Sequence, residues 1–282
     1  MSIITIGSEK LTVKISTFGA ELQSIVDENG VERLWQGDPA FWTGRAPILF
    51  PVAGGLKDDC FEMNGVTYPM PKHGFVRKLE WKVESQEKDK AVFLMDQKDA
   101  GFPFDYEFRA AFTVKGNALT VSYDIKSLDD RAFWFGLGAH EAYATPEGID
   151  KYTIEFEQEE KLDNYVLEGN FTKHEFVCMA ESTKELPLDY KYFAVDALVF
   201  RTVKSRAVTL GSSVHNRKIR VEFPDHPVLM FWTKPGAGYI CIEPWCNGPD
   251  FTDAQHDAST KPGFMKLEKG QSIERHHIIT VL

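Results

Sequence analysis

Polar and hydrophobic residues alternate along much of the chain, the pattern of strands that bury one face. In Leu11–Ser16, Leu11, Val13 and Ile15 would share one face and the polar residues between them the other. Tyr106, Phe108 and Phe112 likewise fall on one face of their strand, so we expect them in the core. The same alternation predicts further strands at Leu79–Ser85, Tyr106–Val114, Ala118–Ser127, Tyr152–Phe156 and Lys218–Phe223.

Turn signals join several of these strands. Asn64-Gly65 is typical of a type I′ turn and would link Phe61–Asn64 to Val66–Pro69. Lys115-Gly116-Asn117 would link two of the alternating runs. Helical signals are few: one turn opening at Asp38-Pro39, and a second within Pro249–Asp257.

No Ser/Gly/Pro-rich linker, charge block or change of composition divides the 282 residues. We therefore expect a single domain over residues 1–282, with on the order of fifteen strands in two packed sheets. The predicted fold class is all-β, a large antiparallel β-sandwich. The 21 Phe, 9 Tyr and 6 Trp fit this class, because aromatic residues favour strands, cores and sugar-facing clefts.

Charge and cysteine content exclude several other classes. A net charge of −10 and a pI near 5.3 argue against a nucleic-acid partner. No apolar run approaches the roughly 20 residues of a membrane-spanning helix, and the first residues carry no secretory signal pattern. The four cysteines form no Cys-x-x-Cys pair, so we expect neither a disulfide scaffold nor a zinc site. A cytoplasmic location, no membrane contact and no metal are the resulting expectations.

Three residues stand out as candidate acid–base groups. Glu243 follows the apolar run Tyr239–Ile242 and precedes Pro244, which we expect to end the strand and leave Glu243 at a cleft mouth or solvent-facing edge. Burial of such a carboxylate would raise its pKa and make it a useful base. His140 ends an apolar stretch, and His73 lies in a glycine-containing loop; each is either an acid–base group or a hydrogen-bonded structural histidine.

Arg45 precedes a run of apolar residues and prolines. Its guanidinium offers a fork of donors suited to sugar hydroxyls, a carboxylate or a phosphate, or it forms a structural ion pair. The sequence contains no Walker loop, no Gly-x-Ser-x-Gly elbow, no His-Glu-x-x-His and no dinucleotide-binding glycine motif. We therefore expect no cofactor.

The ordered set of these segments resembles the aldose 1-epimerase (galactose mutarotase-like) family, and most closely its LacX-like branch. The resemblance covers nearly the whole chain. It rests on Thr17–Leu22, Trp35-Gln36-Gly37, Arg45–Pro51, His73-Gly74-Phe75, Gly138-Ala139-His140 and Cys241–Trp245.

The resemblance implies a β-supersandwich and an enzyme that interconverts the α and β anomers of a free hexose. By position, Glu243 would remove the proton from O1, His140 would protonate the ring oxygen O5, and His73 would support the ring-oxygen side. Arg45 and Asp196 would bind hydroxyls. From residue type alone, Trp232 or Trp245 would supply an apolar face for the sugar.

One segment departs from the family pattern, because Glu141-Ala142-Tyr143 follows the second histidine. We expect this departure to alter the cleft wall beside the proposed acid. Three alternatives stay open: a hexose-6-phosphate 1-epimerase, which needs a basic cluster for which Arg45, Lys72 and Arg77 are candidates; a non-catalytic carbohydrate-binding module; and, less well supported, a glycoside hydrolase or lyase.

Overall fold

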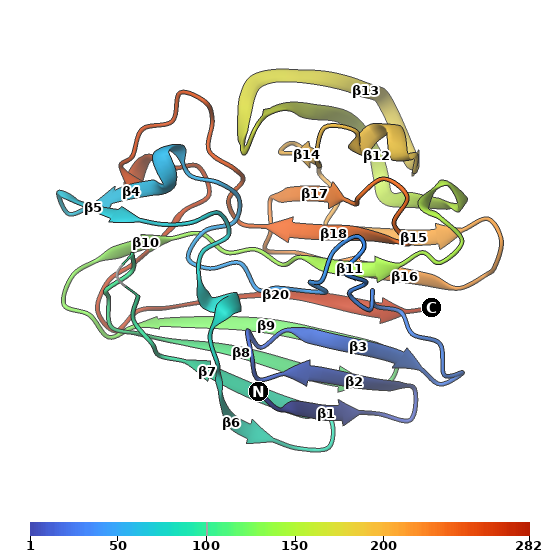
Figure 1. Cartoon of the computed structure of the whole chain (residues 1–282), viewed down its shortest axis with the longest axis horizontal. Coiled ribbons are helices and arrows are strands. Elements are labelled where there is room, and N and C mark those ends of the chain that lie inside the picture. The colour runs from blue at the N-terminus through green and yellow to red at the C-terminus, as the bar shows by residue number, and fades with distance from the viewer. Residues whose placement is uncertain (100) are drawn as a thin grey trace.

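The computed structural model describes residues 1–99 and 101–282 and is built almost entirely of antiparallel β-strands (Figure 1). Its largest sheet has the order β13-β12-β15-β16-β20-β9-β8-β7-β6. In chain order these strands are β6 (Lys82–Gln86), β7 (Lys90–Met95), β8 (Tyr106–Lys115), β9 (Ala118–Ser127), β12 (Tyr152–Glu168), β13 (Phe171–Pro187), β15 (Ala207–Ser212), β16 (Lys218–Glu222) and β20 (Ser272–Val281).

Four smaller sheets accompany it in the described part of the chain. A four-stranded sheet has the order β11-β18-β17-β14, and a three-stranded sheet has the order β1-β2-β3. Their strands are β11 (Glu141–Ala144), β14 (Leu198–Phe200), β17 (Val228–Trp232), β18 (Tyr239–Trp245), β1 (Ile3–Gly7), β2 (Leu11–Ser16) and β3 (Leu22–Asp27). The other two are the pairs β4 (Cys60–Met63) with β5 (Val66–Pro69) and β10 (Phe133–Phe135) with β19 (Met265–Leu267).

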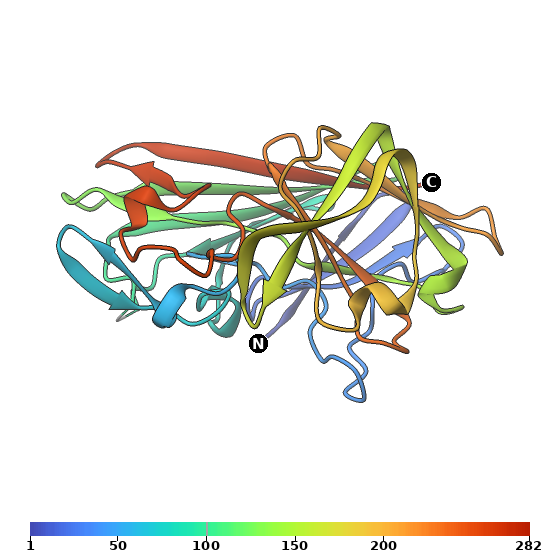
Figure 2. The same ribbon diagram turned by 90° about the horizontal axis from the view of Figure 1, so that it is seen from above.

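The main core lies between the nine-stranded sheet and the smaller sheets, which Figure 2 shows as layers seen from above. Tyr106, Phe108 and Phe112 of β8 are all buried, as their alternation predicts. Phe108 contacts Phe50 at a ring-centroid distance of 4.9 Å, and Phe156 of β12 contacts Phe231 of β17 at 6.5 Å. Aromatic side chains from both layers therefore fill the space between them.

The predicted fold class is confirmed, but the expectation of two packed sheets is a simplification, because the strands of the described residues divide among five sheets.

The predicted turns have mixed outcomes. Asn64 and Gly65 both have positive φ, as a type I′ turn requires. The expected helix within Pro249–Asp257 is wrong: the nearest helical turn is Ala258–Thr260, where Asp257 caps the backbone N–H of Ser259. The other helical turns are single 3₁₀ turns at Lys57–Asp59, Val76–Lys78, Ile149–Lys151 and Tyr190–Phe193.

The hairpin of β12 and β13 is the feature that the sequence pattern underestimates. Its strands have 17 residues each, whereas the alternation predicts only Tyr152–Phe156. In Figure 1 the hairpin arches above β14 and β17. Its turn, including Gly169 and Asn170, reaches the wall of the cavity described below.

Candidate functional site

Glu243 lies near the end of β18, the strand between β11 and β17 in the four-stranded sheet. Its side chain is buried, with 1% of the residue exposed, so the solvent-facing alternative is wrong. The strand also continues through Pro244 to Trp245, contrary to the expected end at the proline. Pro244 lacks an N–H, but its carbonyl oxygen still accepts a hydrogen bond from the backbone N–H of Ala139.

His140 immediately precedes β11 and faces Glu243 across the two strands. Glu141 pairs with Ile242 in this antiparallel ladder, so His140 and Glu243 follow as the next opposed positions on the other face. His140 Nε2 lies 3.4 Å from Glu243 Oε2, and 8% of His140 is exposed. The structure therefore brings the predicted acid and base together.

Glu141 lies on the opposite face of β11, which corrects the expectation that it shapes the cleft wall. Its side chain points into the core between the sheets, where Oε1 lies 3.0 Å from Nε2 of the buried His277 of β20. Successive residues of a strand point to opposite faces, so a change at this position does not reach the cleft directly. Glu141 instead joins the two layers of the fold.

His73 is held in the loop before the Val76–Lys78 turn by two hydrogen bonds to Gly54. The backbone N–H of His73 donates to Gly54 O, and the backbone N–H of Gly54 donates to His73 Nδ1 over 3.1 Å. Because Nδ1 is an acceptor, the ring proton is on Nε2, which is free to donate to a ligand. His73 and His140 contact edge to face, with ring centroids 5.7 Å apart.

Gly74 fixes the path of this loop. Its φ is +67°, and a Cβ there would lie 2.0 Å from the carbonyl oxygen of Phe50. Only glycine fits such a close approach of two backbone segments. This close contact between Gly74 and Phe50 places the neighbouring His73 against the Arg45–Pro51 segment.

Burial shifts the pKa values of all three groups toward their uncharged forms. Desolvation raises the pKa of Glu243 well above 4.5, with Asp196 and Glu141 adding to the rise and Lys72 opposing it. Desolvation lowers the pKa of His140 to about 3 and that of His73 well below 6.5. Such shifts are typical of functional groups that exchange protons in a cleft.

Aromatic rings surround the histidine and carboxylate. Trp42 stacks on His140 with a centroid distance of 5.0 Å and an interplanar angle of 29°, and Trp232 meets His140 edge to face at 5.8 Å. Trp245 contacts His73 at 5.5 Å. Both predicted tryptophans, Trp232 and Trp245, therefore line the site, together with Trp42, for which the sequence predicted no role there.

These residues line a cavity of about 280 Å³. Asp196, half-buried after the Tyr190–Phe193 turn, also lines it. So do Lys72, Arg77 and Asn170, which form a connected group at the wall. Lys72 Nζ donates to Asn170 Oδ1 over 2.9 Å, and Arg77 Nη2 donates to the carbonyl oxygen of Lys72 over 3.0 Å.

Arg45 is the predicted residue that the structure keeps outside this cavity. Its Nη1 donates to Gln23 Oε1 over 2.5 Å and its Nη2 to the carbonyl oxygen of Gln36 over 2.9 Å. These bonds direct the guanidinium toward β3 and the Trp35–Gly37 segment. Lys72 and Arg77, rather than Arg45, therefore supply the positive charge at the wall of the candidate site.

One set of side chains in the described residues has donor types that bind metal. A nitrogen of His140, Sγ of Cys241 and a carboxylate oxygen of Glu243 all lie within 4.8 Å of one another. Cys241 and Glu243 are two residues apart on β18 and so share its cavity-side face. A soft divalent cation such as Zn²⁺ could bind there, but it would occupy the candidate acid–base pair.

No helix in the described part of the chain is both long and apolar enough to cross a membrane.

The model of the aldose 1-epimerase family matches residues 2–280. The chain is 30% identical over 296 aligned positions to the plasmid-encoded protein LacX of Lactococcus lactis subsp. lactis, with 99% of each chain covered.

Two solved structures are closely similar along the whole chain. A galactose mutarotase related enzyme from Lactobacillus acidophilus has a TM-score of 0.94 and 27% identity, covering 100% of this chain and 97% of its own. A galactose mutarotase-like protein from Lactobacillus casei has a TM-score of 0.93 and 28% identity, with 100% of both chains covered.

Proposed function

Because this chain belongs to the aldose 1-epimerase family, we propose that it interconverts the α and β anomers of a free aldohexose. Family membership and the mutarotase-related neighbours support a carbohydrate epimerase, an isomerase. The observation that carries the mechanism is the 3.4 Å separation of His140 Nε2 and Glu243 Oε2 in a cavity lined by aromatic side chains.

Anomer exchange is acid–base chemistry at one carbon atom. A base removes the proton from O1 while an acid protonates the ring oxygen O5, so that the C1–O5 bond breaks and C1 becomes an aldehyde. Rotation about C1–C2 then lets O5 attack the other face of the aldehyde, and both proton transfers reverse. O1 and O5 are bonded to the same carbon, so the acid and the base must lie close together, as these two groups do.

In this proposal Glu243 is the base at O1 and His140 is the acid at O5. In that arrangement Glu243 is a carboxylate, and His140, as an imidazolium, carries the proton that the two groups exchange. Burial favours the uncharged pair, in which Glu243 carries the same proton and His140 is a neutral imidazole. The two arrangements differ only in which group holds the proton. Lys72, which opposes the rise in the pKa of Glu243, and the hydroxyl groups of a bound sugar would both favour the charged arrangement.

The surrounding residues supply binding and orientation. His73 Nε2–H would donate to the ring-oxygen side, because its Nδ1 is committed to Gly54. Asp196 would accept hydrogen bonds from hydroxyl groups, and Trp232 and Trp245 would contact the apolar C–H face of the sugar. No step needs a cofactor or a metal.

The test is polarimetry or proton NMR on freshly dissolved α-glucose and α-galactose. Wild type should equilibrate the anomers faster than buffer, and Glu243→Gln and His140→Asn should each lose about 10²- to 10⁴-fold in rate. His174→Asn, an exposed histidine on β13, is the matched control and should keep the wild-type rate. Saturable sugar binding without faster exchange would instead identify a non-catalytic carbohydrate-binding module and overturn the proposal.

A second candidate substrate is a hexose 6-phosphate, favoured by the two cations Lys72 and Arg77 at one wall of the cavity. A phosphate could bind both side chains if Asn170 released Lys72. Lys72→Met should then raise KM for glucose 6-phosphate and leave KM for glucose nearly unchanged. An equal effect on both sugars would reject this candidate.

A further inference from the structure

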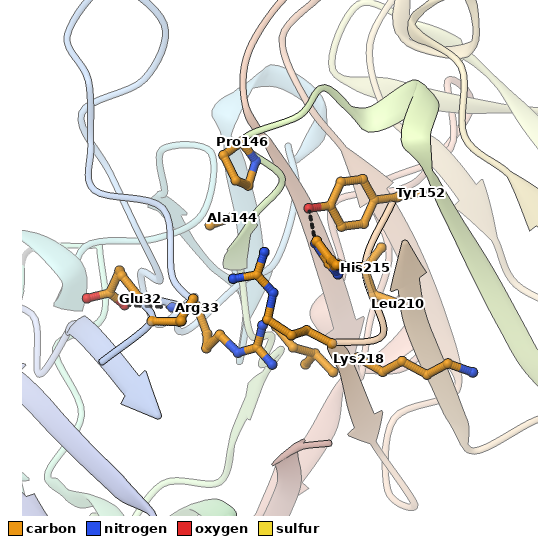
Figure 3. A pocket seen from close by; sticks show the side chains of 11 residues that line it. Glu32, Arg33, Ala144, Pro146, Tyr152, Leu210, His215 and Lys218 are labelled. Atoms are coloured by element: carbon orange, nitrogen blue, oxygen red, sulfur yellow. Dashed lines mark hydrogen bonds between the residues drawn. The ribbon is translucent and has the colours of Figure 1, made fainter. Parts of the chain in front are cut away.

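A second cavity lies between the segment after β3, the end of β11 and the hairpin of β15 and β16 (Figure 3). Among the described residues, it shares no lining residue with the cavity of His140 and Glu243. His140 lines the first cavity and Ala144 the second, and about 13 Å of extended strand separates these two backbone positions. The second cavity is therefore separate from the proposed catalytic site.

Arg33 forms one wall of this second cavity and has unused hydrogen-bonding capacity. Its side chain is 8% exposed, and its Nε lies 3.3 Å from Asp27 Oδ2 without hydrogen-bond geometry. A guanidinium has five N–H donors, and the Nε–H of Arg33 is buried without a hydrogen-bond partner among the described residues. A buried donor without a partner is costly, so an acceptor in this cavity would be stabilised beside Arg33.

Arg217, immediately before the hairpin strand β16, supplies a second guanidinium to the same cavity. Its Nη2 is 3.7 Å from Glu147 Oε1, longer than a hydrogen bond. The positive charge of Arg217 also helps to lower the pKa of Arg33, behind the larger effect of burial. The two cations therefore lie close enough to repel one another, and an anion between them would remove that repulsion.

His215 and Tyr152 form the side of the cavity opposite Arg33 (Figure 3). The Tyr152 hydroxyl donates to Glu147 Oε2 over 2.5 Å, so its oxygen accepts from His215 Nε2 at 3.2 Å. His215 Nδ1 is buried and has no partner among the described residues.

The acidic groups nearby meet each arginine through a single oxygen: Asp27 Oδ2 lies 3.3 Å from Arg33 Nε, and Glu147 Oε1 lies 3.7 Å from Arg217 Nη2. Asp27 Oδ1 is committed to the backbone N–H groups of Asn29 and Val31, which leaves one oxygen toward Arg33. The carboxylate of Glu32 points away from the cavity in Figure 3 and accepts from Ser24 Oγ and three backbone N–H groups.

We propose that this cavity is a binding site for a small oxyanion, held between the guanidinium groups of Arg33 and Arg217. Its volume, about 30 Å³, corresponds to about two water molecules and excludes a sugar ring. Two oxygens of a phosphate group can take the places of two waters and accept from both forks of donors. The proposal does not depend on the function of the catalytic cavity.

Isothermal titration of the full chain with sodium phosphate, at constant ionic strength in phosphate-free buffer, tests the proposal. Wild type should bind one phosphate saturably. Arg217→Gln, a change at a partly exposed side chain, should weaken binding by roughly tenfold or more, as expected for a lost charged hydrogen bond. Arg220→Gln, three residues further along the chain on β16 and paired with Glu157, is the matched control and should bind as wild type does.

A double variant, Lys72→Met with Arg77→Met, distinguishes the two cavities. Phosphate binding that survives in this variant and is lost in Arg217→Gln supports the proposal. Binding lost in the double variant and retained in Arg217→Gln would place the anion in the catalytic cavity and overturn it, as would no saturable heat with wild type. The anomer-exchange assay in phosphate-free buffer is independent of both results.

Discussion

Replacing Glu243 by glutamine should stabilise the fold while removing catalysis. The carboxylate is buried, and its Oε2 has no hydrogen-bond partner among the described residues. Burial raises the pKa of Glu243 well above 4.5, so the ionised group destabilises the folded state relative to the unfolded chain. Each tenfold change in the ionisation constant corresponds to about 1.4 kcal/mol. Glutamine has nearly the same shape and no charge to desolvate.

The sign of this effect depends on pH in a defined way. Below the ordinary carboxyl value of 4.5, Glu243 is protonated in both the folded and the unfolded state, so its ionisation adds no cost. As pH rises through 4.5 toward the raised pKa, only the unfolded state releases the proton, and wild type loses stability relative to the variant. We expect a gain for Glu243→Gln of about 1–3 kcal/mol in the neutral range.

Urea denaturation of both proteins at a pH below 4.5 and at neutral pH measures the difference. Glu185→Gln, the same chemical change on the exposed face of β13, is the control and should show no such pH dependence. A variant less stable than wild type at neutral pH, or a difference that does not grow with pH, would refute the reasoning. The rate of anomer exchange in the same samples should fall by about 10²- to 10⁴-fold.

Three further outcomes follow from the site. The pH profile of kcat/KM should fall as pH rises through the raised pKa of Glu243, because the pair of Glu243 and His140 then holds no proton for O5; a rate that keeps rising with pH would contradict this. Added Zn²⁺ should inhibit anomer exchange, and EDTA should restore the activity. In a dose–response assay, Cys241→Ser should need a roughly tenfold higher Zn²⁺ concentration for the same inhibition. Equal inhibition of wild type and variant would exclude the thiol as a ligand. Gly74→Ala should unfold at a lower urea concentration than Gly65→Ala. Both glycines have positive φ, but only at Gly74 would the added Cβ meet a backbone oxygen, at 2.0 Å. Equal urea midpoints for the two variants would contradict this.

The strands most fully predicted by the sequence are those with one face in the core. β8 and β9 follow the predicted ranges almost to the residue, because each alternates buried and partly exposed positions along its whole length. The alternation does not predict the remainder of β12 beyond Phe156, and the reason is physical. Its pairing with β13 shifts register between Glu155 and Leu162, and most side chains there lie at the surface, so no two-residue period develops.

The family and the main acid–base candidates were also predictable. The resemblance is confirmed by the family match, and the predicted Glu243, His140 and His73 meet in one cavity. Trp42 and Asn170 were not predicted there, because a loop and a distant hairpin turn bring them in. The wall of the cavity thus depends on tertiary contacts that no local pattern records.

The alternation of β11 and β18 also explains why only one of two neighbouring buried carboxylates lines the candidate site. Glu141 and Glu243 lie on adjacent strands but on opposite faces of the same sheet. The core-side carboxylate has a hydrogen-bonded partner in His277, and this contact joins the two layers. The cavity-side carboxylate has only a histidine at 3.4 Å, whose own pKa is lowered by burial to about 3. Each carboxylate keeps one oxygen, Oε2, without a hydrogen-bond partner among the described residues, but only Glu243 lines the cavity, where a substrate proton could reach it.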